Sequence, residues 1–102
     1  MRFLMRISLP TDNGNAMVRD PNFQQKLDKV MGEVKPDAAY FAAENGVRTI
    51  YLSVNIANTY ELPRYVEPFW LSFGASVDVI PAMSQEDFGK AMPIIGEMVK
   101  KY

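Results

Sequence analysis

The chain contains 102 residues, of which 48% are hydrophobic and 23% are charged, and its formal net charge is −1. Such a composition is typical of globular proteins, so we predict a single domain over residues 1–102. The balanced charge argues against a nucleic-acid partner and against binding to a membrane surface. The chain has neither Cys nor His, which excludes disulfides and thiolate catalysis and removes the commonest metal ligand and general base.

No apolar run approaches the roughly 18 residues that a membrane-spanning helix requires. The basic N-terminus leads into Phe3–Leu9, where side chains alternate as in a β-strand rather than as in a signal peptide. We therefore expect a soluble cytoplasmic protein, and we expect no cofactor and no bound metal.

Pro10 ends this first strand, and Thr11–Asn15 is predicted to be a loop. Ala16–Arg19 is expected to form at most a short helical turn. The Asp20-Pro21 pair resembles a helix start, and Lys35-Pro36 ends that helix. Between them an apolar stripe follows helical spacing: Phe23, Leu27, Val30, Met31 and Val34.

The strongest local signal is a β-hairpin about Asn45-Gly46, a dipeptide that favours a two-residue turn. Its strands are expected at Ala39–Glu44 and Val47–Ala57. A two-residue turn fixes the register, which pairs Tyr40 with Tyr51. The same register is expected to place two pairs beneath the helices, namely Phe41 with Ile50 and Ala39 with Leu52.

The last third predicts a helix, a strand and a second helix. Leu62–Phe73 has helical apolar spacing, but Pro68 inside it predicts a kink or two short helices. Ser76–Met83 is predicted to be the fourth strand. Ser84–Asp87 resembles a capping box that starts a C-terminal helix, which is expected to break near Pro93. The apolar residues of that helix could pack on its own sheet or on a partner: Phe88, Met92, Ile95 and Val99.

The predicted order is β-α-β-β-α-β with an extra C-terminal helix, which is the ferredoxin-like plan of an α+β domain. Connection rules favour a four-stranded antiparallel sheet in the order 4-1-3-2, with two helices on one face. Alternation assigns the following residues to the other face, hereafter the open face: Leu4, Arg6, Ser8, Tyr40, Ala42, Thr49, Tyr51, Ser53, Asn55, Ser76, Asp78 and Ile80. This face is too aromatic for a purely solvated surface and too polar for a core. The face could stay in water or dock on a second copy. We predict that it docks, so that two sheets enclose a barrel, because three helices cannot cover both faces of the sheet.

Several motifs resemble those of a small bacterial family of proteins of similar length, whose motifs carry no assigned chemistry. They are Lys35-Pro36-Asp37-Ala38-Ala39-Tyr40-Phe41, Glu44-Asn45-Gly46-Val47-Arg48-Thr49-Ile50-Tyr51, Val54-Asn55, Glu67-Pro68-Phe69 and Pro81-Ala82-Met83. In plan the chain is also similar to the dimeric α/β-barrel proteins, which include muconolactone isomerases, cofactor-independent monooxygenases and stress-response barrel proteins. The second resemblance implies a homodimer with a pocket between the sheets.

Arg6 and Asp78 are expected on adjacent strands of the open face. Arg6 could clamp the carboxylate of a ligand while Asp78 serves as a base. The alternative is an ion pair in or beside a dimer interface, because an internal charge usually finds a partner. Glu44, close to the turn, is expected to be solvated.

Tyr40 and Tyr51 are expected to form a cross-strand pair, which could simply stabilise the sheet or could hold a flat ligand. Asn55 could orient that ligand. Three hypotheses follow. The first is a homodimeric binding module for a small aromatic or acidic metabolite, which uses Arg6, Tyr40, Tyr51, Asn55 and Asp78. The second is a cofactor-independent isomerase or oxygenase on the same face, with Asp78 as general base. The third is a structural or interaction protein without a pocket.

Overall fold

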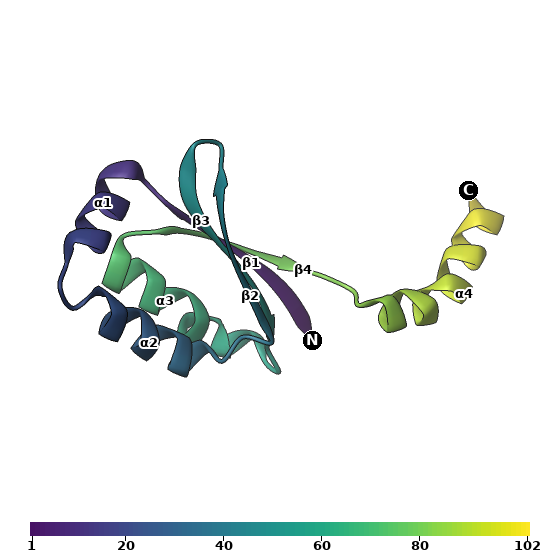
Figure 1. Cartoon of the computed structure of the whole chain (residues 1–102). Coiled ribbons are helices and arrows are strands. Elements are labelled where there is room, and N and C mark those ends of the chain that lie inside the picture. The colour runs from purple at the N-terminus through teal and green to yellow at the C-terminus, as the bar shows by residue number, and fades with distance from the viewer.

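The computed structural model describes residues 1–102 as a four-stranded antiparallel sheet with four α-helices (Figure 1). The elements follow in this order: β1 (Arg2–Leu9), α1 (Thr11–Arg19), α2 (Phe23–Val34), β2 (Ala38–Glu44), β3 (Val47–Asn55), a 3-10 turn at Thr59–Glu61, α3 (Leu62–Phe73), β4 (Ser76–Pro81) and α4 (Gln85–Lys101). This α+β arrangement is compatible with a ferredoxin-like plan. No helix is both long enough and apolar enough to cross a membrane.

The strands lie in the order β2-β3-β1-β4, so that β1 and β3 are central. The hairpin between β2 and β3 turns at Asn45 and Gly46, whose φ angles of 53° and 77° suit a two-residue turn. Its predicted register is confirmed, since Tyr40 pairs with Tyr51 and Phe41 with Ile50. The sequence of the turn therefore decides which side chains of β2 and β3 share a face.

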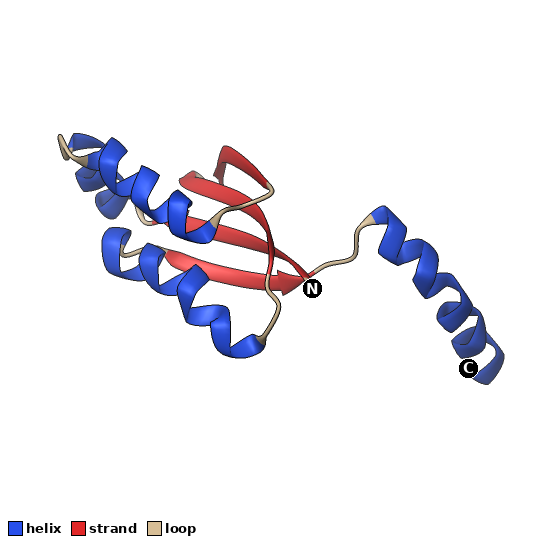
Figure 2. Cartoon of the chain, turned by 90° about the horizontal axis from the view of Figure 1, so that it is seen from below, coloured by secondary structure: helices blue, strands red, loops and turns tan.

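The core lies between the sheet and the helices α1, α2 and α3, which share one side of it (Figure 2). Alternate residues of the central strands are buried there, and each helix adds the apolar stripe that faces them. The buried apolar residues are Met5, Ile7, Leu9, Val30, Val34, Ile50, Leu52, Val54, Ile56, Val66, Phe69, Phe73 and Ala75.

Three local predictions were wrong. Thr11–Asn15 is not a loop but the start of α1, where Asp12 in the first turn and Arg19 in the last turn complement the helix dipole. Pro68 does not divide α3 into two short helices, since the helix runs without interruption from Leu62 to Phe73. The predicted break at Pro93 is likewise absent from α4.

The end of the chain leaves the body of the molecule. In both views α4 projects from the end of β4, away from the sheet and the other helices (Figures 1 and 2). It begins with the predicted capping box, in which Ser84 Oγ accepts a hydrogen bond of 3.1 Å from the Asp87 backbone N–H. Hydrogen bonds from the Ser84 backbone and side chain lower the pKa of the Asp87 carboxyl. None of the residues of α4 is buried.

Candidate functional site

The antiparallel register aligns four predicted site residues in one row across the open face. Tyr40 of β2 stands opposite Tyr51 of β3, Tyr51 opposite Arg6 of β1, and Arg6 opposite Asp78 of β4. Because directly opposed residues share a face, the backbone alone brings these four side chains to one band of the sheet. Asn55 lies apart, at the end of β3, where it pairs with Arg2.

Arg6 is held by two carboxylates. Its Nε and Nη2 donate to Asp78 Oδ2 at 3.1 and 2.9 Å, and its Nη1 lies 3.9 Å from Glu44 Oε2. The hydrogen bond to Asp78, the charge of Asp78 and the charge of Glu44 together raise the pKa of Arg6. Of the two alternatives for Arg6 and Asp78, a ligand clamp with a base or an ion pair, the geometry within one chain is that of the ion pair. The side chain of Asp78 is 54% exposed, so this carboxylate has no dry surroundings.

Glu44 is not simply solvated, as the sequence led us to expect. Its Oε2 accepts a hydrogen bond of 2.5 Å from the Tyr51 hydroxyl. That bond, followed by desolvation and by the charge of Glu44, raises the pKa of Tyr51 above its ordinary value of 10.0. The cluster of Arg6, Asp78, Glu44 and Tyr51 is therefore a closed network with one more negative than positive charge.

Tyr40 and Asn55 stand outside this network. Tyr40 is opposite Tyr51 in the backbone register but is 69% exposed, and the aromatic rings that pair in this protein are Phe69 and Phe73, with centroids 6.5 Å apart. The backbone carbonyl of Asn55 accepts a hydrogen bond of 3.0 Å from the Tyr65 hydroxyl. None of the pockets of this single chain is lined by any of the five predicted site residues.

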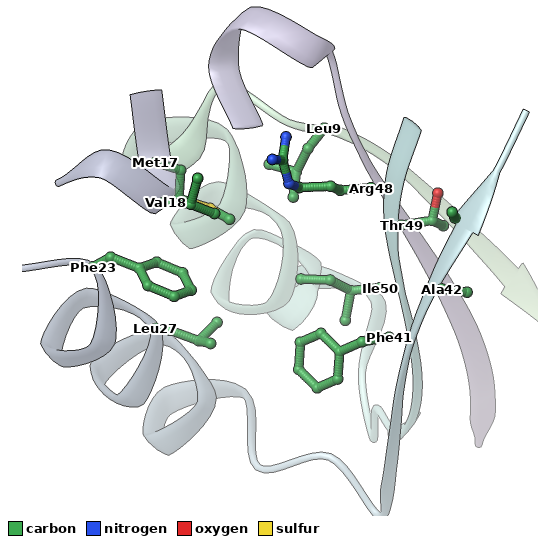
Figure 3. Close-up of a pocket in the computed structure, with 11 residues that line it drawn as sticks. Leu9, Met17, Val18, Phe23, Leu27, Phe41, Ala42, Arg48, Thr49 and Ile50 are labelled. Carbon is green, nitrogen blue, oxygen red and sulfur yellow. The ribbon is translucent and has the colours of Figure 1, made fainter. Parts of the chain in front are cut away.

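An apolar groove of about 440 Å³ lies mainly on the helix side of the sheet and is also bordered by Ala42 and Thr49, which were assigned to the open face (Figure 3). Phe23 and Leu27 of α2 face Phe41 and Ile50 across it. The whole lining consists of Leu9, Met17, Val18, Phe23, Leu27, Phe41, Ala42, Ala43, Arg48, Thr49 and Ile50. This volume falls within the range of roughly 300–1,000 Å³ that is usual for small-molecule sites.

The groove exists because β2 is an edge strand that the helices do not cover. Phe41 was expected beneath the helices and does lie on their side of the sheet, but it is 65% exposed, and Ala39 is exposed as well. The prediction that both residues would be covered was therefore wrong. Alternation identifies the face on which a side chain lies, but not whether the facing helix reaches the outermost strand.

Arg48 is the one charged residue of the groove lining, and sequence reasoning missed it. Its guanidinium donates from Nη1 to Asn15 Oδ1 at 3.0 Å and forms no salt bridge. Gly14 makes room for it, since a Cβ on Gly14 would stand 2.8 Å from Arg48 Nη1. A glycine in the first turns of a helix, opposite an arginine, was the signal that could have identified this approach.

Comparison with protein-family models finds no match for this chain, and a search of curated proteins finds no similar sequence. No three acidic side chains lie close enough together to hold a metal ion. Two surfaces of this chain therefore remain as candidate sites, the charged network of the open face and the apolar groove with Arg48.

Proposed function

We propose that this protein is a binding module for a small aromatic or apolar acid, which it takes into the groove between the β2–β3 hairpin and the helices α1 and α2. The observation that carries the proposal is Arg48, a cation without a carboxylate partner at the wall of an apolar groove of about 440 Å³. The ring or chain of the ligand would cover Phe41 and Leu27, and its acid group would pair with Arg48.

The sequence-based hypothesis placed the same class of ligand on the open face. Arg6 could bind an acid there only by giving up contacts to Asp78 or Glu44, and the local excess of negative charge repels an anion. The enzymatic alternative needs Asp78 in a dry cavity, which a single chain does not provide. A site on the open face would therefore require a second copy to enclose it, whereas the groove is complete in one chain.

We also propose that two copies pair through the open face, as the similarity to dimeric α/β-barrel proteins implies. Leu4 and Ile80, which are opposed in the register of β1 and β4, both expose apolar surface on that face. Pairing would cover this surface and leave the groove accessible, because the groove lies mainly on the helix side of the sheet.

The ligand proposal can be tested with two fluorescent probes of the same ring system, anilinonaphthalene sulfonate, which is an acid, and N-phenylnaphthylamine, which is neutral. We expect the variant Arg48→Gln to weaken binding of the acid by roughly tenfold to a hundredfold, the value of one charge-assisted hydrogen bond, and to leave the neutral probe unchanged. The matched control is Arg19→Gln, which removes an exposed arginine of α1 that does not line the groove. Equal binding of the acid by the wild type and Arg48→Gln would refute the site.

A further inference from the structure

We infer that α4 is an exchanged arm, whose apolar face packs on the open face of a second copy of this chain. The inference rests on the pairing of two copies proposed above and assigns to it a specific contact. It does not depend on the ligand groove.

The arm carries an apolar stripe that nothing in its own chain covers. Phe88, Met92, Ile95 and Val99 recur at spacings of three and four residues, which places them along one side of the helix. They are exposed, and Val99 is exposed to 72%. Charged side chains occupy the opposite side: Glu86, Lys90, Glu97, Lys100 and Lys101. A helix with this pattern is normally stable only when its apolar side is packed against another surface.

The short connection after β4 carries the arm away from its own sheet (Figures 1 and 2). Ala82 still belongs to the sheet end, because its backbone N–H donates to the carbonyl of Arg2 at 3.1 Å. Ser84 is fixed as the helix cap. Met83 is thus the one residue between the sheet end and the helix cap, and the backbone there directs α4 outward rather than back over the sheet. In this conformation the apolar side of α4 can be covered only by another molecule.

The large exposed surface of the chain supports a second copy as the molecule that covers α4. The chain exposes 7131 Å², whereas a compact monomer of 11.6 kDa exposes roughly 5,800 Å². Likewise its radius of gyration is 16.7 Å, against roughly 13 Å for a compact domain of this length. The excess of roughly 1,300 Å² exceeds the roughly 800 Å² that each partner contributes to a stable interface of standard size.

The open face is the acceptor that this geometry favours. Leu4 and Ile80 lie at the end of the sheet from which α4 departs, since Ile80 is followed directly by the last residue of β4. In a two-fold dimer paired through this patch, each arm would leave its own sheet beside the same patch of the partner, within reach of it. The groove, by contrast, lies at β2, on the opposite edge of the sheet. The negative excess around Arg6 also suits the basic end of α4, Lys100 and Lys101.

The first test is the solution mass by light scattering over a range of concentrations. We expect the wild type near twice 11.6 kDa, and Ile95→Lys on the arm and Ile80→Lys on the open face each to raise the dimer dissociation constant at least tenfold. Leu71→Lys is the control, since Leu71 is an even more exposed apolar residue, lies on α3 away from both proposed surfaces, and should leave the dimer intact. Unfolding curves of all three variants establish that they remain folded.

The possible results distinguish the proposal that α4 is an exchanged arm from the proposal that two copies pair through the open face. A wild type that stays monomeric at every concentration would overturn both, and a monomer with a radius of gyration near that of a compact domain would show that α4 folds back. A dimer unaffected by Ile95→Lys would leave the pairing intact but overturn the arm.

The acceptor surface can be tested directly because the chain has no cysteine of its own. Val99→Cys chains are mixed with a size-tagged chain that carries either Ile80→Cys or Phe41→Cys, and a bismaleimide is added. We expect cross-links between the two kinds of chain with Ile80→Cys and not with Phe41→Cys. The reverse preference would place the arm on the groove and refute the open face as acceptor.

Discussion

Arg6 and Arg48 show how the neighbours of an arginine decide whether it can bind an anionic ligand. Arg6 contacts Asp78 and lies close to Glu44, so its positive charge is neutralised by carboxylates of its own chain. Arg48 has only the amide oxygen of Asn15. An anionic ligand would have to displace two carboxylates from Arg6 but only one neutral hydrogen bond from Arg48. The sequence does not distinguish the two, because the difference arises from the side chains that the fold brings near each of them.

Gly14→Ala offers a way to move Arg48 without removing it. The new methyl group would stand 2.8 Å from Nη1, the far end of a flexible side chain, so that the guanidinium must shift. Alanine in place of glycine inside α1 should meanwhile stabilise the protein by roughly 0.5–1 kcal/mol. We expect a raised midpoint of urea unfolding together with weaker binding of anilinonaphthalene sulfonate. Unchanged binding in a stabilised variant would contradict the role given to Arg48.

The hydrogen bond between Tyr51 and Glu44 should make the stability of the protein depend on pH in the alkaline range. It raises the pKa of Tyr51 above 10.0, so it stabilises the native state below pH 10 and is lost as the pH rises through the pKa of the folded protein. Glu44→Gln should lower the pKa of Tyr51, visible as phenolate absorbance that appears at lower pH in a spectrophotometric titration. Glu97→Gln, which removes an exposed carboxylate of α4, serves as the charge-matched control.

At the scale of single elements, the features that depend on local backbone preferences could be predicted from the sequence. Asn45 and Gly46 specify the hairpin and its register on their own, and alternation assigned Arg6 and Asp78 to one face. The extent of α1 was missed because its first residues, Asp12, Asn13, Gly14 and Asn15, are types that favour turns. Glu44 was missed because its partner Tyr51 is reached across the hairpin. Periodicity could not show that the helices leave β2 uncovered, and thus could not predict the groove.

The end of α2 provides a test of backbone strain. Lys35 closes the helix with φ 49° and ψ 62°, a left-handed conformation that costs roughly 1–2 kcal/mol for a residue with a side chain. Lys35→Gly should therefore stabilise the protein by roughly 0.5–1 kcal/mol in urea unfolding, after the entropic cost of glycine. The same substitution at Lys29, which is exposed inside α2, should destabilise by a similar amount. Two changes of the same sign would contradict this assignment.

For the whole molecule, the balance between core and surface is unusual. Only 15 of the 102 residues are buried, and all 17 residues of α4 lie outside the core. The apolar area that a small domain buries scarcely offsets its conformational entropy, so an arm that ordered 17 residues without burying any would oppose folding. The protein can be stable with this arm if the apolar side of α4 becomes buried when two chains associate.

Stability should consequently depend on the concentration of the chain. Association that buries the arm stabilises the folded state by mass action, so the melting temperature is expected to rise with each tenfold increase in protein concentration. In Ile95→Lys, whose arm carries a charge within its apolar stripe, the weaker association should lower the melting temperature at each concentration toward that of the dilute wild type. Calorimetry of both proteins over the same concentrations measures the difference. Identical melting temperatures of the two proteins at every concentration would contradict the arm, because a stripe buried on association must lose stability when a charge is placed within it.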